Sequence, residues 1–90
     1  MNKNDLIDAV AERTGLAKSD AARAVEAVVG AITETLQKGD VVALSGFGSF
    51  ATKVRAARTG RNPRTGEPVA IPASRAPAFK AGKALKDALN

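Results

Sequence analysis

The decapeptide RTGRNPRTGE, residues 58–67, decides how the second half of this chain is organised. Its Asn-Pro and Thr-Gly pairs are turn signals, and they lie among three arginines. The flanking segments have extended character but few large apolar side chains, so a hairpin here cannot bury itself in a core. We therefore expect a basic β-ribbon that projects from the body with Pro63 at its tip. Such a ribbon is suited to the minor groove of DNA.

Composition limits the size of the hydrophobic core. The chain has 90 residues, enough for one small domain, and 19 of its 40 hydrophobic residues are alanine. A domain of this size buries only about 60–65% of its unfolded surface even when all of it is compact. A projecting ribbon lowers that share further. We therefore expect a homodimer, in which a second copy supplies the missing core.

Charge is divided unequally between the two halves of the chain. Residues 1–40 contain five basic and seven acidic side chains, whereas residues 41–90 contain nine basic and two acidic ones. This asymmetry indicates a scaffold half and a half that binds a polyanion, for which nucleic acid is the best candidate. An anionic membrane surface is disfavoured because the basic half lacks the apolar face of an interfacial helix. The lack of cysteine, of a signal peptide and of a membrane-spanning stretch favours the cytoplasm.

Two amphipathic helices are expected in the first half. The first covers residues 3–13, with Asn2 or Asn4 as its N-cap and Gly15 as a left-handed residue after its end. The second covers residues 18–38 and carries an apolar stripe at helical spacing. We interpret this pair as scaffold and dimer core.

The second half reads as strands followed by a short helix, which makes the fold class α+β. A short strand over 41–44 is followed by a glycine turn at 46–48 and a second strand from Ser49 that continues into the arm. The chain returns from the tip over 68–72, where two prolines indicate an edge-like ribbon. A C-terminal helix is expected over 80–89, with Pro77 marking its entry.

Nearly all charge on the predicted arm has one sign, which a hairpin charged only for solubility does not explain. Strict strand alternation places Arg55 and Arg58 on opposite faces, and either a bulge near Ala56-Ala57 or a twist of the ribbon would bring them together. Three lysines recur every third residue at the C-terminal helix and suit phosphate contacts, although a solvated helix face has the same pattern. The candidate DNA-binding residues are Lys3, Lys53, Arg55, Arg58, Arg61, Asn62, Pro63, Arg64, Arg75, Lys80, Lys83 and Lys86.

Pro63 has two compatible interpretations. Asn-Pro commonly starts a turn, so Pro63 is first a turn residue. An apolar ring at the tip of a basic arm also suits a wedge that enters between two base pairs and kinks the duplex. Both interpretations hold together, because the turn presents the ring.

Enzymatic chemistry is poorly supported. The segment GFGSFA, residues 46–51, matches a dinucleotide-binding pattern, but that pattern requires a helix to begin at the glycines, and the following residues alternate like a strand. The chain has no histidine or cysteine, and no cluster has general acid/base or metal-ligand spacing. We therefore expect no catalytic residue, no metal, no cofactor and no small-molecule substrate.

The chain resembles the bacterial HU family of histone-like, nucleoid-associated proteins over essentially all its length. The resemblance rests on GFGSF at 46–50, on GRNP at 60–63 followed by TGE at 65–67, and on PAFKAGK at 77–83. It implies an intertwined homodimer with a helical base, a three-stranded β-saddle and two arms that embrace double-stranded DNA, with Pro63 intercalating. It also implies little sequence preference, a preference for bent, nicked or gapped DNA, and a role in compacting the chromosome in the nucleoid.

Within this single domain, 1–90, the helical dimerisation part is expected over 1–40, the sheet and arm over 41–76, and the C-terminal helix over 77–90. The expected dimer core is Val28, Val29, Ile32, Leu36, Leu44, Phe47, Phe50 and Phe79.

A departure at Ala17 and two alternatives accompany the resemblance. Ala17 stands where such chains often place a Ser or Thr N-cap, which lowers stability unless Ser19 or Asp20 substitutes. The first alternative is a site-specific relative, or a paralogue that works as half of a heterodimer; a site-specific factor would prefer one sequence over random DNA by about 10³ or more. A structural dimer that binds acidic proteins or lipid would not distinguish straight from kinked DNA.

Overall fold

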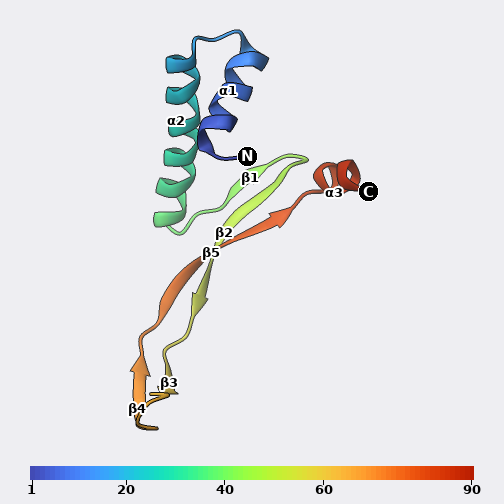
Figure 1. Ribbon diagram of the computed structural model, residues 1–90. Helices are drawn as coiled ribbons and strands as arrows, with labels where there is room; N and C mark the ends of the chain where they lie inside the picture. The colour runs from blue at the N-terminus through green and yellow to red at the C-terminus, as the bar shows by residue number, and fades with distance from the viewer. The chain divides into compact units, whose positions relative to one another are not determined.

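The computed structural model describes all residues 1–90, in the order helix, helix, five strands, helix (Figure 1). The chain divides into a first unit, Met1–Thr35, and a second unit, Leu36–Asn90. Helices α1 (Lys3–Thr14) and α2 (Lys18–Gln37) make up the first unit, except that the last two residues of α2 belong to the second. No helix has both the length and the apolar character needed to cross a membrane.

Helix α1 is defined by strong signals at both ends. At its start, Asn2 Oδ1 accepts from the Asp5 N–H at 2.9 Å, and the Asp5 carboxylate accepts from the Asn2 N–H at 3.1 Å, which is a capping box. At its end, Gly15 has φ of 74° and donates its N–H to the Ala11 carbonyl. The cap by Asn2 and the left-handed Gly15 confirm two predictions from the sequence.

The first unit has a very small core. Only Ile7, Ala21 and Val25 are buried, and Val10, Ala11 and Ala22 pack partly against them. Two ion pairs join the helices on the outside, Lys3 with Glu26 and Lys18 with Asp8. Ala17 precedes α2 without a side-chain acceptor, and Asp20 in the first turn pairs with Arg23. The N–H groups at the start of α2 therefore receive no side-chain cap from these residues.

The second unit contains two antiparallel sheets. The first is ordered β1-β2-β5 and is built from β1 (Val42–Leu44), β2 (Gly48–Arg55) and β5 (Ser74–Ala81). The second is the ribbon of β3 (Arg58–Arg61) and β4 (Pro68–Ile71), which we call the arm together with its tip, residues 62–67. Helix α3 (Lys83–Leu89) follows β5.

A glycine turn joins β1 to β2 and also holds the start of α3. The Gly82 N–H donates to the Phe47 carbonyl at 2.7 Å, and the Leu85 N–H donates to the Gly46 carbonyl at 3.1 Å. A Cβ at Gly48 would lie 2.6 Å from the Phe79 ring, so only glycine fits there. Phe79 in turn lies against Phe50, its cross-strand partner, with ring centroids 4.8 Å apart.

The C-terminal helix begins later than the sequence indicated. Strand β5 runs through Lys80 to Ala81, so the helix starts at Lys83 rather than Lys80, and the prediction that 77–90 is helical is wrong for residues 77–81. Pro77 lies inside β5, opposite Thr52, and does not mark a helix entry. A proline is tolerated there because β5 is an edge of its sheet, where a missing N–H need not break a ladder bond.

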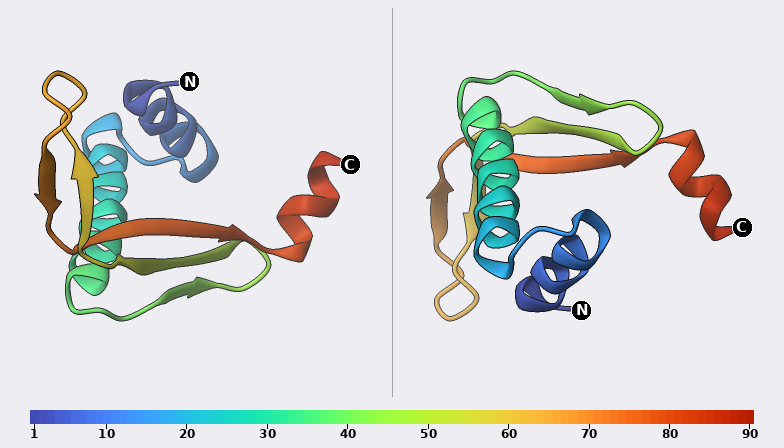
Figure 2. Two further views of the ribbon diagram at one scale, coloured as in Figure 1. Left: turned by 90° about the horizontal axis from the view of Figure 1, so that it is seen from below. Right: turned by 90° about the horizontal axis from the view of Figure 1, so that it is seen from above.

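The two sheets of the second unit are one long hairpin with an interruption. Arg55 pairs with Ser74 on one side of the break, and Arg58 pairs with Ile71 on the other. Two residues on each strand, 56–57 and 72–73, lie between these pairs, so no residue is inserted and the register is kept. Of the two alternatives drawn from the sequence, a bulge near Ala56-Ala57 or a twist of the ribbon, the bulge is therefore excluded. Beyond this break the ribbon turns away from the direction of β2 and β5 (Figure 2).

Candidate nucleic-acid interface

The basic side chains of the arm come from β3 and the tip, and none comes from β4. Arg58 and Arg61 lie on β3 and Arg64 lies in the tip, whereas β4 has the uncharged sequence PVAI. All three arginines are exposed, and the second unit contains no salt bridge. Glu67 is the single acid of the arm and forms no salt bridge with these arginines, so their positive charge is uncompensated. Uncompensated arginines on a thin ribbon can replace the counterions of a nucleic-acid backbone.

At the root of the arm, a fourth arginine, Arg55, lines the same hollow as Arg58. Arg55, the last residue of β2, and Arg58, the first of β3, both line an open hollow there, with Ile71, Pro72 and Ser74 on the opposite strand. An unbroken flat ribbon would place these arginines on opposite faces. Because no bulge is present, we attribute the position of both side chains at one hollow to the turn of the ribbon at the break. This outcome was the second of the two alternatives drawn from the sequence.

The tip is a closed hydrogen-bonded loop built around Asn62. The Asn62 N–H donates to the Glu67 carbonyl at 2.9 Å, and the Gly66 N–H donates to the Asn62 carbonyl at 2.8 Å. Asn62 Oδ1 also accepts from the Arg64 N–H at 2.8 Å, so the side chain of Asn62 spans Pro63. Gly66 has φ of 74°, which closes the turn. Pro63 is exposed in the middle of this loop.

Arg61 takes part in the structure of the tip. Its Nη1 donates to the Gly66 carbonyl at 3.2 Å, across the base of the loop. The remaining donors of its guanidinium are available to a ligand. Arg61 therefore both supports the tip and presents charge beside Pro63.

One contact in the arm was not foreseen from the sequence. A Cβ added at Gly60 would lie 2.8 Å from Cδ1 of Ile71, so the isoleucine side chain occupies the space that a larger residue would need. Ile71 is one of the few half-buried residues of the arm. A glycine on one strand and a β-branched residue diagonal to it on the other was the available signal. The side chain of Ile71 therefore packs directly over the backbone of Gly60.

The remaining candidate residues are distributed over several elements. Lys53 is exposed on β2, Lys80 is exposed near the end of β5, and Lys83 and Lys86 are exposed on α3. The sequence placed Lys80, Lys83 and Lys86 on one helix, but only Lys83 and Lys86 lie on α3. Lys3 lies in the first unit and is paired with Glu26. Arg75, on β5, donates to a backbone carbonyl within the second unit.

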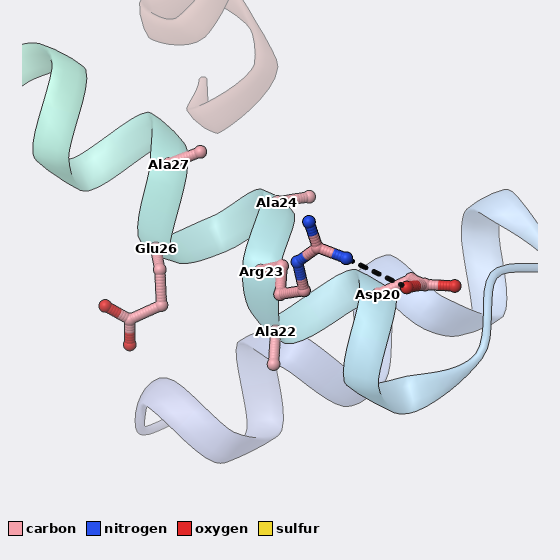
Figure 3. A pocket seen from close by; sticks show the side chains of 6 residues that line it. All are labelled: Asp20, Ala22, Arg23, Ala24, Glu26 and Ala27. Atoms are coloured by element: carbon pink, nitrogen blue, oxygen red, sulfur yellow. Dashed lines mark ion pairs between the residues drawn. The ribbon is translucent and has the colours of Figure 1, made fainter.

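No arrangement suited to catalysis accompanies the basic residues. An open hollow on α2 is lined by alanines and three charged residues (Figure 3). Two of these form an ion pair, with Arg23 Nη1 3.8 Å from Asp20 Oδ1. These side chains are exposed and lack a nucleophile or a base with a partner. No group of three potential metal ligands is present. The glycines of residues 46–48 lead into strand β2, so the context of a dinucleotide-binding turn is absent.

Comparison with known proteins identifies the family. The family model described as bacterial DNA-binding protein matches residues 1–90, the whole chain. The chain is 64% identical over 89 residues to DNA-binding protein HU of Geobacillus stearothermophilus, and the match covers 99% of both proteins. The chain belongs to the bacterial HU family. It is also 56% identical to DNA-binding protein HU-beta of Escherichia coli K12, over the full length of both.

Solved HU structures share this fold. The Anabaena HU–DNA cocrystal structure matches with a TM-score of 0.90 and 47% identity, covering 99% of this chain and 97% of that one. HU from Thermotoga maritima matches with a TM-score of 0.70 and 34% identity over the full length of both chains. The HU family consists of structural DNA-binding proteins rather than enzymes, in agreement with the expectation from the sequence.

Proposed function

We propose that this chain is an architectural protein of the nucleoid, which binds double-stranded DNA with little sequence preference and bends it. The observation that carries the proposal is the arm, which combines three exposed and unpaired arginines with an exposed Pro63 at its tip. The length and charge of such a ribbon suit the minor groove, where the negative potential attracts arginine. The family and the Anabaena HU–DNA structure support this proposal.

In the proposed mechanism, the basic side chains provide affinity for DNA and Pro63 bends it. The arginines of the arm, with Lys53 and Arg55 at its root, release counterions from the backbone and provide most of the affinity. Pro63 enters between two base pairs and unstacks them, at a cost of about a few kcal/mol that added contact surface offsets. The lysines near the C-terminus, Lys80, Lys83 and Lys86, contact phosphates on the bent flanks. DNA that is already kinked, nicked or gapped avoids part of the unstacking cost and binds more tightly.

A gel-shift titration at several salt concentrations tests this function. It compares a random-sequence linear duplex with the same duplex carrying a nick or a two-nucleotide gap. We expect tighter binding to the interrupted duplexes, with log Kd rising steeply with log salt concentration. Equal and weak binding to all three would contradict the architectural role. Preference for one intact sequence by about 10³ would instead indicate a site-specific protein.

We further propose that the functional form is a homodimer. In the single chain, Val28 and Val29 on α2 are 57% and 54% exposed, and Phe47 and Phe79 are 47% and 45% exposed. An almost wholly apolar groove in the first unit, lined by Leu6, Val10, Ala24, Val25, Val28 and Val29, has no occupant within the chain. Large apolar groups are rarely left exposed over a contiguous patch in a stable monomer. A second copy that covers these faces, together with Ile32, Leu36, Leu44 and Phe50, supplies the core that one chain lacks.

A pair of valine substitutions tests the dimer. Val28→Lys places a charge in the proposed core, whereas Val54→Lys places the same charge at a valine that is 75% exposed on β2 and outside that core. Sedimentation equilibrium at micromolar concentration is expected to give a dimer for the parent and for Val54→Lys. Val28→Lys is expected to be monomeric and largely unfolded, because an unpaired buried charge is strongly destabilising. A dimeric Val28→Lys variant would contradict the proposed core. A parent chain that forms a dimer only after mixing with a paralogue would indicate a heterodimer.

A further inference from the structure

Arg75 is set apart from the other basic residues of the second unit by its contacts. Its Nη1 and Nη2 atoms each lie 3.3 Å from the carbonyl oxygen of Gln37, which is 38 positions away in the sequence. Gln37 is the last residue of α2, and the last four carbonyls of a helix have no partner within the helix. Two of the N–H donors of the guanidinium thus meet an acceptor that the helix itself cannot satisfy.

The electrostatics of the helix end favour this contact. The C-terminal end of an α-helix carries a partial negative charge, which basic side chains in the last turn usually balance. The last turn of α2 has no basic residue. Arg75 brings the positive charge from a different element, and the planar guanidinium directs two N–H groups at one oxygen in a way that a lysine ammonium does not reproduce.

Arg75 lies close to the break in the ribbon, so its hydrogen bonds to Gln37 act on the root of the arm. Arg75 is the second residue of β5 and pairs with Val54, one step from the Arg55–Ser74 pair that ends the first sheet. The break at 72–73 follows immediately toward the arm. The bond to Gln37 therefore holds β5 one residue before the point at which the ribbon is interrupted. Arg55 differs, because its side chain lines the open hollow at the break.

We infer that Arg75 is a positioning residue, which fixes the root of the arm to the end of α2 and does not neutralise a DNA phosphate. This inference departs from the expectation that Arg75 belongs to the DNA-binding set, and it rests on the proposed function for the meaning of the arm. It predicts that removing the charge of Arg75 disturbs the root of the arm in the free protein and leaves the electrostatic part of DNA binding intact.

The test compares Arg75→Gln and Arg75→Lys with Arg55→Gln, which removes the same charge one residue pair nearer the break. The first measurement is the salt dependence of binding to the gapped duplex. Arg55→Gln is expected to lower the log-log slope by about 0.9, the value for one lost phosphate contact. Arg75→Gln is expected to keep the slope of the parent. Loss of the preference for gapped DNA by the parent itself would contradict the proposed function and not this inference.

The second measurement is amide hydrogen exchange of the free protein at residues 52–55 and 74–76. Arg75→Gln is expected to exchange several-fold faster than the parent there, Arg75→Lys to be intermediate, and Arg55→Gln to match the parent. Faster exchange with an unchanged slope supports the positioning role. A slope lowered by about 0.9 in Arg75→Gln, with or without faster exchange, assigns Arg75 to the DNA contacts and overturns it. Exchange equal to that of the parent in both Arg75 variants overturns it as well.

Discussion

The first unit and the arm differ in whether their basic side chains have acidic partners. In the first unit, Lys3, Lys18 and Arg23 each have an acidic partner, whereas no arginine of the arm has one. The paired charges are exposed and contribute little to stability, about 0–1 kcal/mol each, but they present little net field. The arm has a single acid among its arginines, so its field is directed outward. The difference indicates that the first unit serves as scaffold and that the arm is shaped for a polyanion.

The strongest test of this comparison removes three charges from either region. Replacing Arg58, Arg61 and Arg64 together by glutamine is expected to lower the log-log salt slope by about 2.7, because each lost phosphate contact contributes about 0.9. The matched control replaces Arg13, Lys18 and Arg23 by glutamine and removes the same net charge from the helices. Gel shifts at three salt concentrations measure both. Equal effects from the two triple variants would show that only net charge matters and would remove the distinction between the units.

The next test separates the effect of the Pro63 ring on DNA bending from the effect of the arginines on affinity. Pro63→Ala leaves every arginine in place but removes the rigid ring from the tip, so we expect bending of DNA to fall much more than affinity for a linear duplex. Fluorescence transfer between dyes at the two ends of a short duplex reports the bend. A Pro63→Ala variant that bends DNA as far as the parent would exclude intercalation by this residue.

A smaller effect is expected from the residue that holds the wedge. Asn62→Ala removes the 2.8 Å bond to the Arg64 N–H, which is worth about 0.5–1.5 kcal/mol, so Pro63 is presented less firmly and bending is reduced in part. Asn62→Asp keeps the acceptor oxygen and is expected to retain the bend while binding more weakly. Thr65→Ala is the control, because it removes a longer bond of 3.3 Å to the Glu67 N–H. If Thr65→Ala reduces bending more than Asn62→Ala does, Asn62 is not the residue that orders the tip.

The smallest change is expected from the scaffold. Ala17→Ser supplies the missing N-cap of α2 and is expected to stabilise the protein by about 1 kcal/mol, which raises Tm by about 4–8 °C. The salt slope of DNA binding should not change, since no charge is altered. Ala31→Ser, in the exposed middle of α2, is the control and should lower Tm slightly, because serine is a weaker helix former than alanine. Thermal unfolding followed by circular dichroism decides between these outcomes.

Local signals in the sequence predicted local structure well. The Asn2 cap, the left-handed Gly15 and the turn around Asn62 depend on residues within a few positions of one another, and all are present. The C-terminal helix was extended too far because lysines at 80, 83 and 86 have helical spacing, although Lys80 pairs with Ser49 in the sheet. Pairing between strands is a long-range property, and a three-residue lysine repeat contains no information about it.

The features that the sequence could not provide all join distant residues. Nothing around Arg75 points to the carbonyl of Gln37, because a free helix end is not marked by any one residue type. The sequence left open whether the ribbon has a bulge or a twist near residues 56–57, since the residues of one strand do not show which residues of the other lie opposite. The candidate DNA contacts remain predictions, which the arm variants described above are designed to test.

The unchanged register across the break limits how the length of the arm can vary during evolution. Losing Ala56 alone would slip one strand against the other and turn every side chain beyond it to the opposite face of the ribbon. Losing Ala56 together with Ala73, which occupies the matching place on the other strand, would restore the pairing but still exchange the faces at the tip. Only the loss or gain of two residues on each strand keeps both pairing and orientation. Arm length in such chains is thus expected to change in matched steps of four residues.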